Sequence, residues 1–481
     1  MFNKKALQGV IYMALFFSWL LFIPFYGPGQ YILTTIPEAS NIFILGHIIG
    51  MLHCGWYYAS RKKVDKYIVE KILVILIPIC IAIAFIAQSM IIDIVTFLII
   101  GYASSMLVIR WASWFSSSDF SSYRGLLMGM TIALSNIFLF AYTKLLYFED
   151  YYSWVILLSS LLGTLGVFLI LELSMTAGRG IEFNMKRALP PWHLLVFAIF
   201  AFMAGGFLYS AVYSVEVDVS LQLRSLTIFA YIIGVVFFGY LADKFSKIIL
   251  LPSLFTVIGI GFVLLIINKG YVPLYLISES VILFGLGCAD LYYWLTLADH
   301  SIKEYIPFVF AVGLSFHLVV ISFTATMTEH FLMNSDWGFS LVGIIGSITM
   351  FLGIFFSFWV YRLFNPTEDI LKYGETYNLG EAMSVATIPV EEASGKGIDM
   401  EYLNNIFDEL TPDSFGLTQR EKELALLLLQ GFSYVQIAEQ LFISNHTVKY
   451  HVRNILRKAD VNNRHELSSV IWERISHFKS Q

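Results

Sequence analysis

The sequence predicts an all-α protein: a large membrane-embedded helical bundle followed by a small helical domain. Three observations predict this fold class. Of the 481 residues, 58% are hydrophobic and only 14% are charged, whereas soluble domains are nearer half apolar and a quarter charged. Long apolar runs follow one another as far as residue 362. After about residue 416 the chain is polar, and its apolar residues are spaced as in short amphipathic helices.

Twelve apolar runs are long enough to cross a bilayer, which takes about 20 residues for about 30 Å of hydrocarbon. Only Asp93 marks the boundary between the third and fourth runs. The first run lacks a small-residue cleavage site, so we expect it to be a retained helix. The predicted spans are roughly 6–25, 40–58, 72–90, 92–114, 124–147, 152–175, 192–215, 221–242, 247–267, 271–297, 305–328 and 338–362.

Lys and Arg predict the orientation, because cytoplasmic loops of membrane proteins are enriched in them. With the N-terminus inside, the cytoplasmic side receives most of these residues, including the cluster at 61–71. The opposite side receives Lys144, Arg224 and Lys269. We therefore expect a multi-pass protein of the cytoplasmic (inner) membrane with both termini in the cytoplasm. The three cysteines lie in apolar runs and have no metal-site or disulfide spacing.

The loop at 239–247, GYLADKFSK, carries a recognisable pattern. Its glycine permits close helix approach, its aspartate can cap a helix end, and its lysines face the inner leaflet. It resembles the G-x-L-A-D-R/K-x-G-R/K signature of major facilitator superfamily transporters, and the resemblance implies that family's twelve-helix fold. In the first half of the chain only Gly55 and the basic cluster survive, and Ala59 occupies the aspartate position.

Four ionisable residues inside the predicted spans are candidates for ligand binding: Arg110, Glu279, Asp290 and His317. Such groups are costly in a membrane and by default suggest function. The resemblance implies that spans four and ten line the ligand site, so Arg110, Glu279 and Asp290 could form a central polar site. The alternative is that they join helices or snorkel to the interface. We expect Trp19, Trp56, Trp192 and Trp294 to form an interfacial belt rather than a binding cage.

The connector after the last span is rich in acidic residues and weakly periodic, which predicts a flexible tether. We expect a membrane domain at 1–362, a linker at 363–413 and a C-terminal domain at 414–481. A short amphipathic helix around 402–410 is expected to precede that domain.

The C-terminal domain predicts four short helices. Short polar residues followed three positions later by Glu or Gln, the signature of a helix N-terminus, occur at Thr418, Ser433 and Asn463, and Ser444 precedes the third helix. On the third helix Val448, Val452, Ile455 and Leu456 form a stripe that we expect to be buried. The opposite stripe consists of polar and cationic residues at steps of three and four: His446, Lys449, Tyr450, Arg453 and Arg457. Such a helix suits the DNA major groove.

This segment resembles the LuxR/GerE-type helix-turn-helix of bacterial regulators. The residues that carry the resemblance include Leu417, Thr418, Arg420, Glu421, Gly431, Ala438, Leu441, Thr447, Val448, Lys449, His451, Ile455, Lys458, Val461, Arg464 and Glu466. The resemblance implies that Lys449, Tyr450 and Arg453 face bases and that Thr447 and Arg457 contact phosphates. His446 is a further candidate for DNA contact. The fourth helix, about 464–478, is expected to form a homodimer.

Together these patterns predict a membrane-embedded one-component transcriptional regulator. Its expected partners are promoter DNA, the lipid bilayer and a small-molecule ligand, with RNA polymerase as a further candidate. The alternative is a major facilitator-type secondary transporter with an autoregulatory DNA-binding domain. The sequence contains no nucleotide-binding loop, nucleophile-with-base constellation or metal-site spacing, so we expect neither an enzyme nor a cofactor.

Overall fold

A computed structural model describes most of the chain outside the connector, and the statements below refer to the described residues. These are 4–25, 27–29, 36, 39–60, 67–87, 89–146, 152–173, 184–212, 225–245, 247–267, 271–299, 303–332, 338–364, 416–429, 432, 434–441, 445–461, 466–467 and 470. Within them every regular element is a helix, which confirms the predicted all-α class. The chain divides into two compact units, Met1–Glu368 and Asp369–Gln481.

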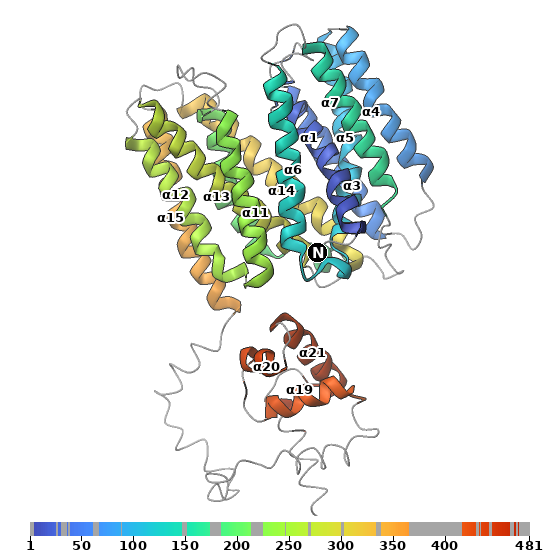
Figure 1. The fold of residues 1–481 in the computed structure, drawn as a ribbon, viewed down its shortest axis with the longest axis vertical. Helices are drawn as coiled ribbons and strands as arrows, with labels where there is room; N and C mark the ends of the chain where they lie inside the picture. Colours follow the sequence, from blue (N-terminus) through green and yellow to red (C-terminus); the bar gives the residue numbers. More distant parts are fainter. Residues whose placement is uncertain are drawn as a thin grey trace, which may run out of the picture. The chain divides into compact units, whose positions relative to one another are not determined.

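Unit 1 contains twelve long helices among its described residues, one for each predicted span (Figure 1). The first six are α1 (Lys4–Phe22), α3 (Ala39–Ser60), α4 (Tyr67–Ala87), α5 (Met90–Phe115), α6 (Arg124–Leu145) and α7 (Tyr152–Leu171). The second six are α9 (Trp192–Phe207), α11 (Ile228–Lys244), α12 (Lys247–Ile267), α13 (Val272–Ala298), α14 (Ile306–Met327) and α15 (Gly338–Phe364). A four-residue helix, α8 (Met185–Ala188), lies between the two sets.

Eleven of the described helices are long and apolar enough to cross a membrane. In α4 the described apolar stretch, Ile75–Ala87, is shorter than a full span. The helix of the third span, α4, ends at Ala87, and Asp93, expected at the boundary, lies instead in the first turn of α5. An acidic residue is favourable within the first turn of a helix as well as before it. Asp93 therefore did not locate the helix boundary from the sequence alone.

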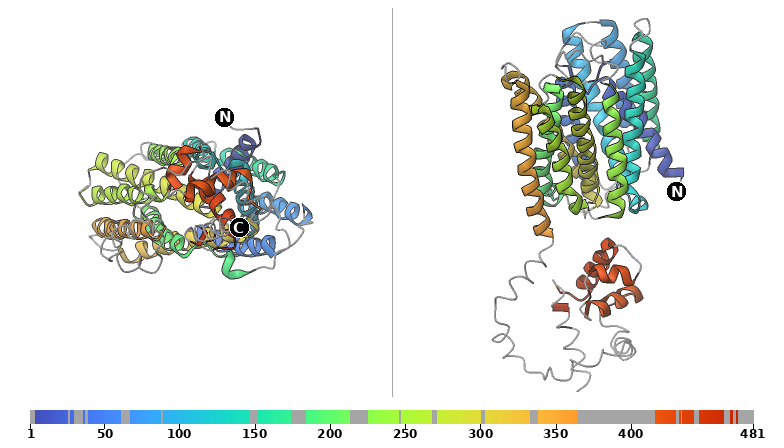
Figure 2. Two further views of the ribbon diagram at one scale, coloured as in Figure 1. Left: turned by 90° about the horizontal axis from the view of Figure 1, so that it is seen from below. Right: turned by 60° about the vertical axis from the view of Figure 1, so that its left-hand side comes forward.

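The helices of unit 1 form two bundles that meet along two helix pairs. In the first bundle α3 packs on α5 and α1 packs on α6 and α7; in the second α12 packs on α15 and α13, and α14 packs on α9. The bundles meet where α6 contacts α11 and where α3 contacts α14. Figures 1 and 2 show the long helices running side by side. We call this boundary the seam.

Glycines permit both contacts across the seam. A Cβ atom on Gly239 of α11 would lie 2.5 Å from the carbonyl oxygen of Gly125 in α6. A Cβ atom on Gly55 of α3 would lie 2.3 Å from the Cβ of Ala311 in α14. Such distances exclude larger side chains unless the helices move apart. The role predicted for the glycine of the loop signature is therefore confirmed, and Gly55 plays the same role although its loop lacks the aspartate.

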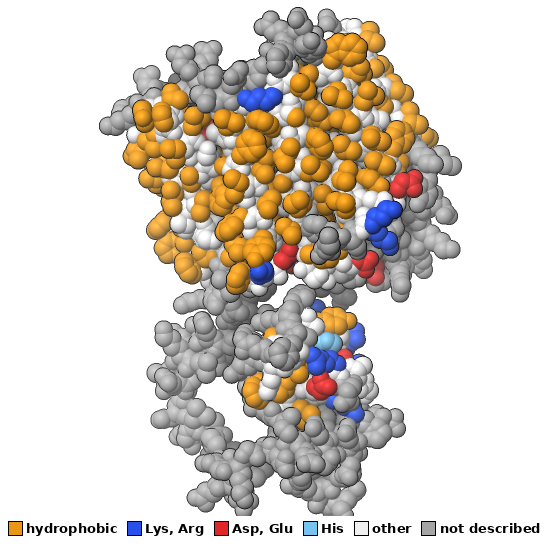
Figure 3. Space-filling model, in the orientation of Figure 1, with side chains coloured by type: hydrophobic (Ala, Val, Ile, Leu, Met, Phe, Trp, Pro, Cys, Tyr) orange, Lys and Arg blue, Asp and Glu red, His pale blue; other side chains and the backbone are white. Residues whose placement is uncertain are grey.

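The surface of unit 1 is apolar, as expected for a body solvated by lipid. Figure 3 shows hydrophobic side chains covering the visible face of this unit. Aromatic residues such as Phe351, Phe355 and Phe358 of α15 are more than half exposed. An apolar surface of this extent is unusual for a soluble protein and marks contact with a membrane or a partner.

The predicted tryptophan belt is only partly correct. Trp56 and Trp192 are about half exposed, as residues of an interfacial belt would be, but Trp19 and Trp294 are buried. Trp19 stacks on Phe16, and Trp294 contacts Phe17 and Trp111 edge-on. These two side chains face other helices, because tryptophan is large and apolar enough to contribute strongly to a core.

Unit 2 contains α19 (Gln419–Leu429), α20 (Tyr434–Gln440) and α21 (Asn445–Lys458). These helices surround a hydrophobic core of their own, to which Leu424, Ile437, Val448, Val452 and Ile455 belong. Of the predicted fourth helix, only Glu466, Leu467 and Val470 are described, and all three are helical. The connector, including the helix expected at 402–410, and the caps expected at Ser433, Ser444 and Asn463 lie outside the described residues.

Candidate DNA-binding face and candidate ligand site

The first helix of unit 2 starts with the predicted reciprocal cap. The backbone N–H of Thr418 donates to Glu421 Oε2 at 2.8 Å, and the N–H of Glu421 donates to Thr418 Oγ1 at 3.4 Å. Such a capping box satisfies two amides that a helix N-terminus leaves without partners. The prediction for Thr418 and Glu421 is confirmed.

The same carboxylate also ties α21 to α19. Lys458, the last residue of α21, donates to Glu421 Oε2 at 2.6 Å and to the carbonyl oxygen of Gly416 at 2.8 Å. Burial alone would raise the pKa of Glu421, but the hydrogen bonds from Lys458 and Thr418 outweigh it and hold the pKa below its ordinary value of 4.5. This carboxylate is therefore charged at neutral pH and fixes the angle between the two helices.

Arg420 fixes the end of α20. Its Nη2 donates to the carbonyl oxygen of Leu441 at 2.7 Å, and its Nη1 pairs with Glu423 Oε2 at 2.7 Å. Leu441 directly follows α20, at the start of the connection to α21. A guanidinium with several donors in a fixed plane can hold both groups at once, so Arg420 positions the turn of the helix-turn-helix.

The two faces of α21 agree with the prediction at the described positions, except that Leu456, expected in the buried stripe, is only partly buried. Val448, Val452 and Ile455 are buried in the core of unit 2. On the other face Tyr450 is 59% exposed, and Arg453 and Arg457 are exposed. Residues 450, 453 and 457 follow one another at steps of three and four, so they share one side of the helix. We call these three exposed residues the DNA-facing stripe.

The other candidate contacts lie on the same helix. Thr447 is partly buried at the first turn of α21. His446 and Lys449 belong to the helix, but their side chains lie outside the described part of the structure. Among the described residues of unit 2, Tyr450 is the one exposed large hydrophobic side chain, so an aromatic ring precedes the two arginines of the stripe.

The C-terminal end of α21 is closed by a residue in the left-handed region. Asp460 has a φ of 54°, and the N–H of Val461 donates to the carbonyl oxygen of Leu456 at 3.0 Å. This six-to-one bond is the mark of a Schellman motif, which usually has glycine at this position.

In unit 1, two of the four candidate ligand residues come together. Asp290 of α13 and His317 of α14 lie with Oδ1 and Nε2 3.9 Å apart. Tyr231 of α11 donates from its hydroxyl to Asp290 Oδ2 at 2.5 Å. The ring of Phe202 in α9 lies 3.9 Å from the imidazole of His317, centroid to centroid. Four helices of the second bundle thus contribute to one polar cluster, which we call the Asp290 cluster.

Arg110 and Glu279 lie elsewhere. Arg110 donates from Nε to the carbonyl oxygen of Ile170 at 3.2 Å and from Nη2 to those of Leu171 and Leu173 at 2.6 and 2.9 Å. It therefore satisfies carbonyls that the end of α7 leaves open. Glu279 accepts from Thr227 Oγ1 at 3.1 Å and lies about 16 Å along α13 from Asp290, at about 1.5 Å per residue.

The sequence did not predict Tyr231 as a member of the Asp290 cluster. A tyrosine in an apolar span is ordinarily a core or interface residue, and its partner is 59 positions away. No local signal in the sequence distinguishes it from the other tyrosines of the membrane spans.

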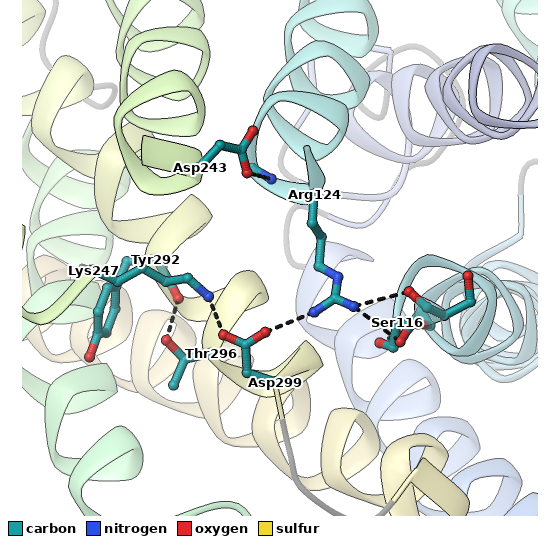
Figure 4. A network of polar contacts seen from close by, with 10 residues as sticks. Ser116, Arg124, Asp243, Lys247, Tyr292, Thr296 and Asp299 are labelled. Atoms are coloured by element: carbon teal, nitrogen blue, oxygen red, sulfur yellow. Dashed lines mark hydrogen bonds and ion pairs between the residues drawn. The ribbon is translucent and has the colours of Figure 1, made fainter. Parts of the chain in front are cut away.

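A second polar network crosses the seam at one end of unit 1 (Figure 4). Asp243, the acid of the loop signature, accepts from the backbone N–H groups of Gly125 and Leu126 at 2.7 and 2.8 Å. Arg124 Nη1 pairs with Asp299 Oδ1 at 2.7 Å, and Lys247 donates to the other oxygen of Asp299. The predicted capping role of Asp243 is confirmed, and the helix that it caps is α6, in the other bundle.

An aromatic layer also joins the two bundles. Trp294 of α13 contacts Phe17 of α1 and Trp111 of α5, each at 6.0 Å between ring centroids, and Phe310 of α14 at 5.4 Å. Trp294, Trp111 and Phe310 are buried, and Phe17 is partly buried. Trp294 lies one helical turn beyond Asp290 toward Asp299 on the same helix. The aromatic contacts and the Arg124–Asp299 pair therefore close the seam at this end of the bundle.

Comparison with known proteins decides the nature of unit 2. Residues 416–471 match the family model of bacterial regulatory proteins of the luxR family. Residues 416–471 form a LuxR-type domain. A similar protein is the nitrate/nitrite response regulator protein homolog of Haemophilus influenzae, 38% identical over 85 residues, which are 17% of this chain and 41% of the relative. The chain spans less than half the length of the first curated relatives that it matches.

Unit 1 is similar to solved membrane transporters. The proton:xylose symporter XylE of the major facilitator superfamily aligns with a TM-score of 0.56 at 12% identity, over 74% of this chain and 94% of the symporter. A bacterial homologue of the iron transporter ferroportin aligns with a TM-score of 0.55 at 11% identity, over 74% of this chain and 98% of the homologue. At this identity the likeness concerns the fold, and unit 1 has the major facilitator fold. The LuxR-type domain thus follows a major facilitator body.

Proposed function

We propose that this protein is a membrane-embedded one-component transcriptional regulator. In this proposal a membrane domain at 1–362 senses a small molecule, and a linker at 363–413 connects it to a C-terminal domain at 414–481. This domain, which we call the head, binds promoter DNA in the cytoplasm. The single observation that carries the proposal is the exposed stripe on α21, Tyr450, Arg453 and Arg457, within a segment that matches the luxR family. The proposal assigns the chain no catalytic activity.

The chemistry of the stripe suits DNA. Exposed arginines neutralise phosphates and release counterions, and arginine or lysine near the start of a recognition helix can bond guanine in the major groove. The buried opposite face anchors α21 on α19 and α20, so the helix can enter the groove without unfolding the head. We propose base contacts for Lys449, Tyr450 and Arg453 and phosphate contacts for Thr447 and Arg457, with His446 beside them.

The membrane body carries a candidate site for the ligand. The Asp290 cluster is a polar group of residues inside a bundle, where ionisable residues are costly and by default functional. We propose that a ligand of this cluster shifts the equilibrium between a closed and an open seam. A ligand acts only through its different affinities for the two states, and a tenfold difference corresponds to about 1.4 kcal/mol. The Arg124–Asp299 pair is the contact that such a shift would break.

We further propose that the output involves pairing of two heads through the helix that includes Glu466 and Leu467, and contact with RNA polymerase at the promoter. In this proposal both termini lie in the cytoplasm, where the chromosome is.

The test uses full-length protein in lipid nanodiscs and a labelled fragment of the promoter nearest its gene, with fluorescence anisotropy at fixed salt. Charge reversal at Arg453 or Lys449 is expected to abolish specific binding. Lys422→Glu, which reverses a charge on α19 instead, is expected to retain it. Equal affinity of Arg453→Glu and the unaltered protein would refute the proposed DNA-binding face.

A second candidate function is secondary transport combined with autoregulation. It is favoured by the extent of the likeness, since the chain aligns with 94% of a proton symporter. Uptake of the inducing compound into cells distinguishes the two. In a transporter, replacing Asp290 and Glu279 with amides abolishes uptake. In a sensor without transport activity, the same change alters only the dose at which transcription responds.

A further inference from the structure

Asp290 is a carboxylate within the membrane body whose described partners carry no permanent positive charge. Its two contacts are the hydroxyl of Tyr231 and the imidazole of His317. Two other acids of the body have compensating partners: Asp299 has both Arg124 and Lys247, and Asp243 caps a helix. A carboxylate inside a membrane needs a compensating partner. The Asp290 cluster could therefore be compensated by a cation from a ligand.

The cluster faces the seam. α11 and α14 are the helices of the second bundle that contact α6 and α3 of the first. Tyr231 and His317 lie on these two helices, and Asp290 contacts both, so it lies on the side of α13 directed between them. The side chains of Asp290 and His317 keep 21% and 16% of their surface exposed. Lipid contact for a carboxylate would be costly, so this exposed surface is best explained by access to the space between the bundles.

We propose that Asp290 and His317 bind the primary ammonium group of a small organic amine. The distance of 3.9 Å between Asp290 Oδ1 and His317 Nε2 is too long for a direct hydrogen bond. An ammonium group has three donors, so it can donate to Asp290 Oδ1 and to His317 Nε2 when the imidazole is neutral with its proton on Nδ1. The inference rests on the proposed function, in which the body senses a small molecule.

The surroundings of the two residues fit this ligand class. The rings of Phe202 and Tyr293 lie 3.9 and 5.9 Å from the imidazole of His317 between centroids. Aromatic faces attract cations and accommodate the alkyl part of an amine. An anionic ligand is disfavoured by Asp290. A metal ion is disfavoured because no group of three or more His, Cys, Asp or Glu lies together in the part of the chain that the structure describes, and protein metal sites ordinarily use at least three.

Closure of the seam limits the path of entry. Trp294, one turn from Asp290 on α13, contacts Phe17 and Trp111 across the seam, and the Arg124–Asp299 pair lies beyond it. In the proposed orientation this is the cytoplasmic side. Entry of the amine from that side therefore requires these contacts to separate.

The experiment measures binding to full-length protein in detergent by isothermal titration calorimetry without DNA. The probes are n-butylammonium, putrescine, tetramethylammonium, butanoate and glucose. We expect n-butylammonium and putrescine to bind, and tetramethylammonium, which has no N–H donor, to bind at least tenfold more weakly. Asp290→Asn is expected to weaken n-butylammonium at least tenfold. Glu329→Gln, which removes an exposed acid in the short π-helix after α14 (Thr328–Leu332), is expected to leave affinity unchanged.

Three results would overturn the inference. They are unchanged n-butylammonium affinity in Asp290→Asn, equal affinity for tetramethylammonium, and an Asp290-dependent affinity for butanoate or glucose that n-butylammonium lacks. His317→Phe, which removes the second acceptor but keeps an aromatic ring, is expected to weaken the amine as well and covers the case in which Asp290→Asn misfolds. Because the assay contains no DNA, its failure leaves the promoter-binding test of Arg453 unaffected.

Discussion

Arg124 at the start of α6 and Asp299 at the end of α13 join the two bundles of the membrane body through an ion pair of 2.7 Å. Arg124 also donates to the carbonyl oxygens of Ser116 and Ser117 at 3.3 and 3.0 Å, within its own bundle. Lys247 contacts the same Asp299 from within the second bundle. The two cations therefore differ in one respect: only Arg124 holds the bundles to each other.

Asp299→Asn is expected to open this end of the seam, because it removes the charge that holds Arg124. A water-soluble maleimide is expected to label a cysteine introduced at Thr296 several-fold faster in the Asp299→Asn background. Thr296 lies within the network in Figure 4 and is partly buried, while Cys54, Cys80 and Cys288 are buried. Lys247→Gln is the matched control, since it leaves the cross-seam pair in place. Equal labelling in both variants would show that the pair does not hold the seam.

Asp243 stabilises the start of α6 from the other bundle, because its two carboxylate oxygens accept from two backbone amides. Asp243→Ala is expected to lower the stability of the body by about 1 kcal/mol, the usual effect of losing a helix N-cap. Asp243→Asn keeps one acceptor oxygen and is expected to lower it less. Thermal unfolding in detergent, followed by tryptophan fluorescence, measures both. An equal loss in the two variants would indicate that charge rather than capping matters.

The membrane spans could be predicted because each long apolar run must become a helix in a bilayer, where every backbone amide needs a partner. The pairs across the seam could not be predicted in the same way. Arg124 and Asp299 are 175 positions apart, and each stands near other loop charges. The loop signature indicated that Asp243 caps a helix, but nothing near Asp243 specified α6 as that helix.

In the head, too, the helix faces could be predicted from the sequence but a long-range pair could not. Helical periodicity separated Val448 and Val452 from Tyr450 and Arg453, and the structure has the first pair buried and the second exposed. Lys458 resembles a further cation of the exposed face, yet it pairs with Glu421 37 positions away. Among the candidate ligand residues, only Asp290 and His317 came together. The sequence could not decide this, because hydrophobic spans carry almost no information about which face of each helix meets which neighbour.

The stability of the head is expected to depend on the charge of Glu421. Because its pKa is lowered in the folded state, its contribution is complete above the ordinary pKa of 4.5 and disappears as the pH falls through the folded value. The hydrophobic core of unit 2 is its own, so urea unfolding of residues 369–481 is the appropriate measurement. Glu421→Gln is expected to be less stable than the unaltered fragment at pH 7 and equally stable near pH 3. A constant difference across this range would contradict the assignment.

Arg453 and Arg457 occupy one exposed stripe, but they should act differently on DNA. Arg453 lies in the middle of α21, where recognition helices read base edges, whereas Arg457 lies in the last turn, with its Nη2 3.4 Å from Asn454 Oδ1. Arg453→Ala is expected to weaken the preferred site by about 1–3 kcal/mol and to relax discrimination between sites. Arg457→Ala is expected to weaken all sequences alike and to reduce the slope of log affinity against log salt by about one. Titrations of full-length protein with specific and unrelated DNA at several salt concentrations separate the two effects. Were Arg457→Ala to relax discrimination while Arg453→Ala did not, the recognition helix would have to enter the groove by its C-terminal end, and the assignment of base contacts to Lys449, Tyr450 and Arg453 would be wrong.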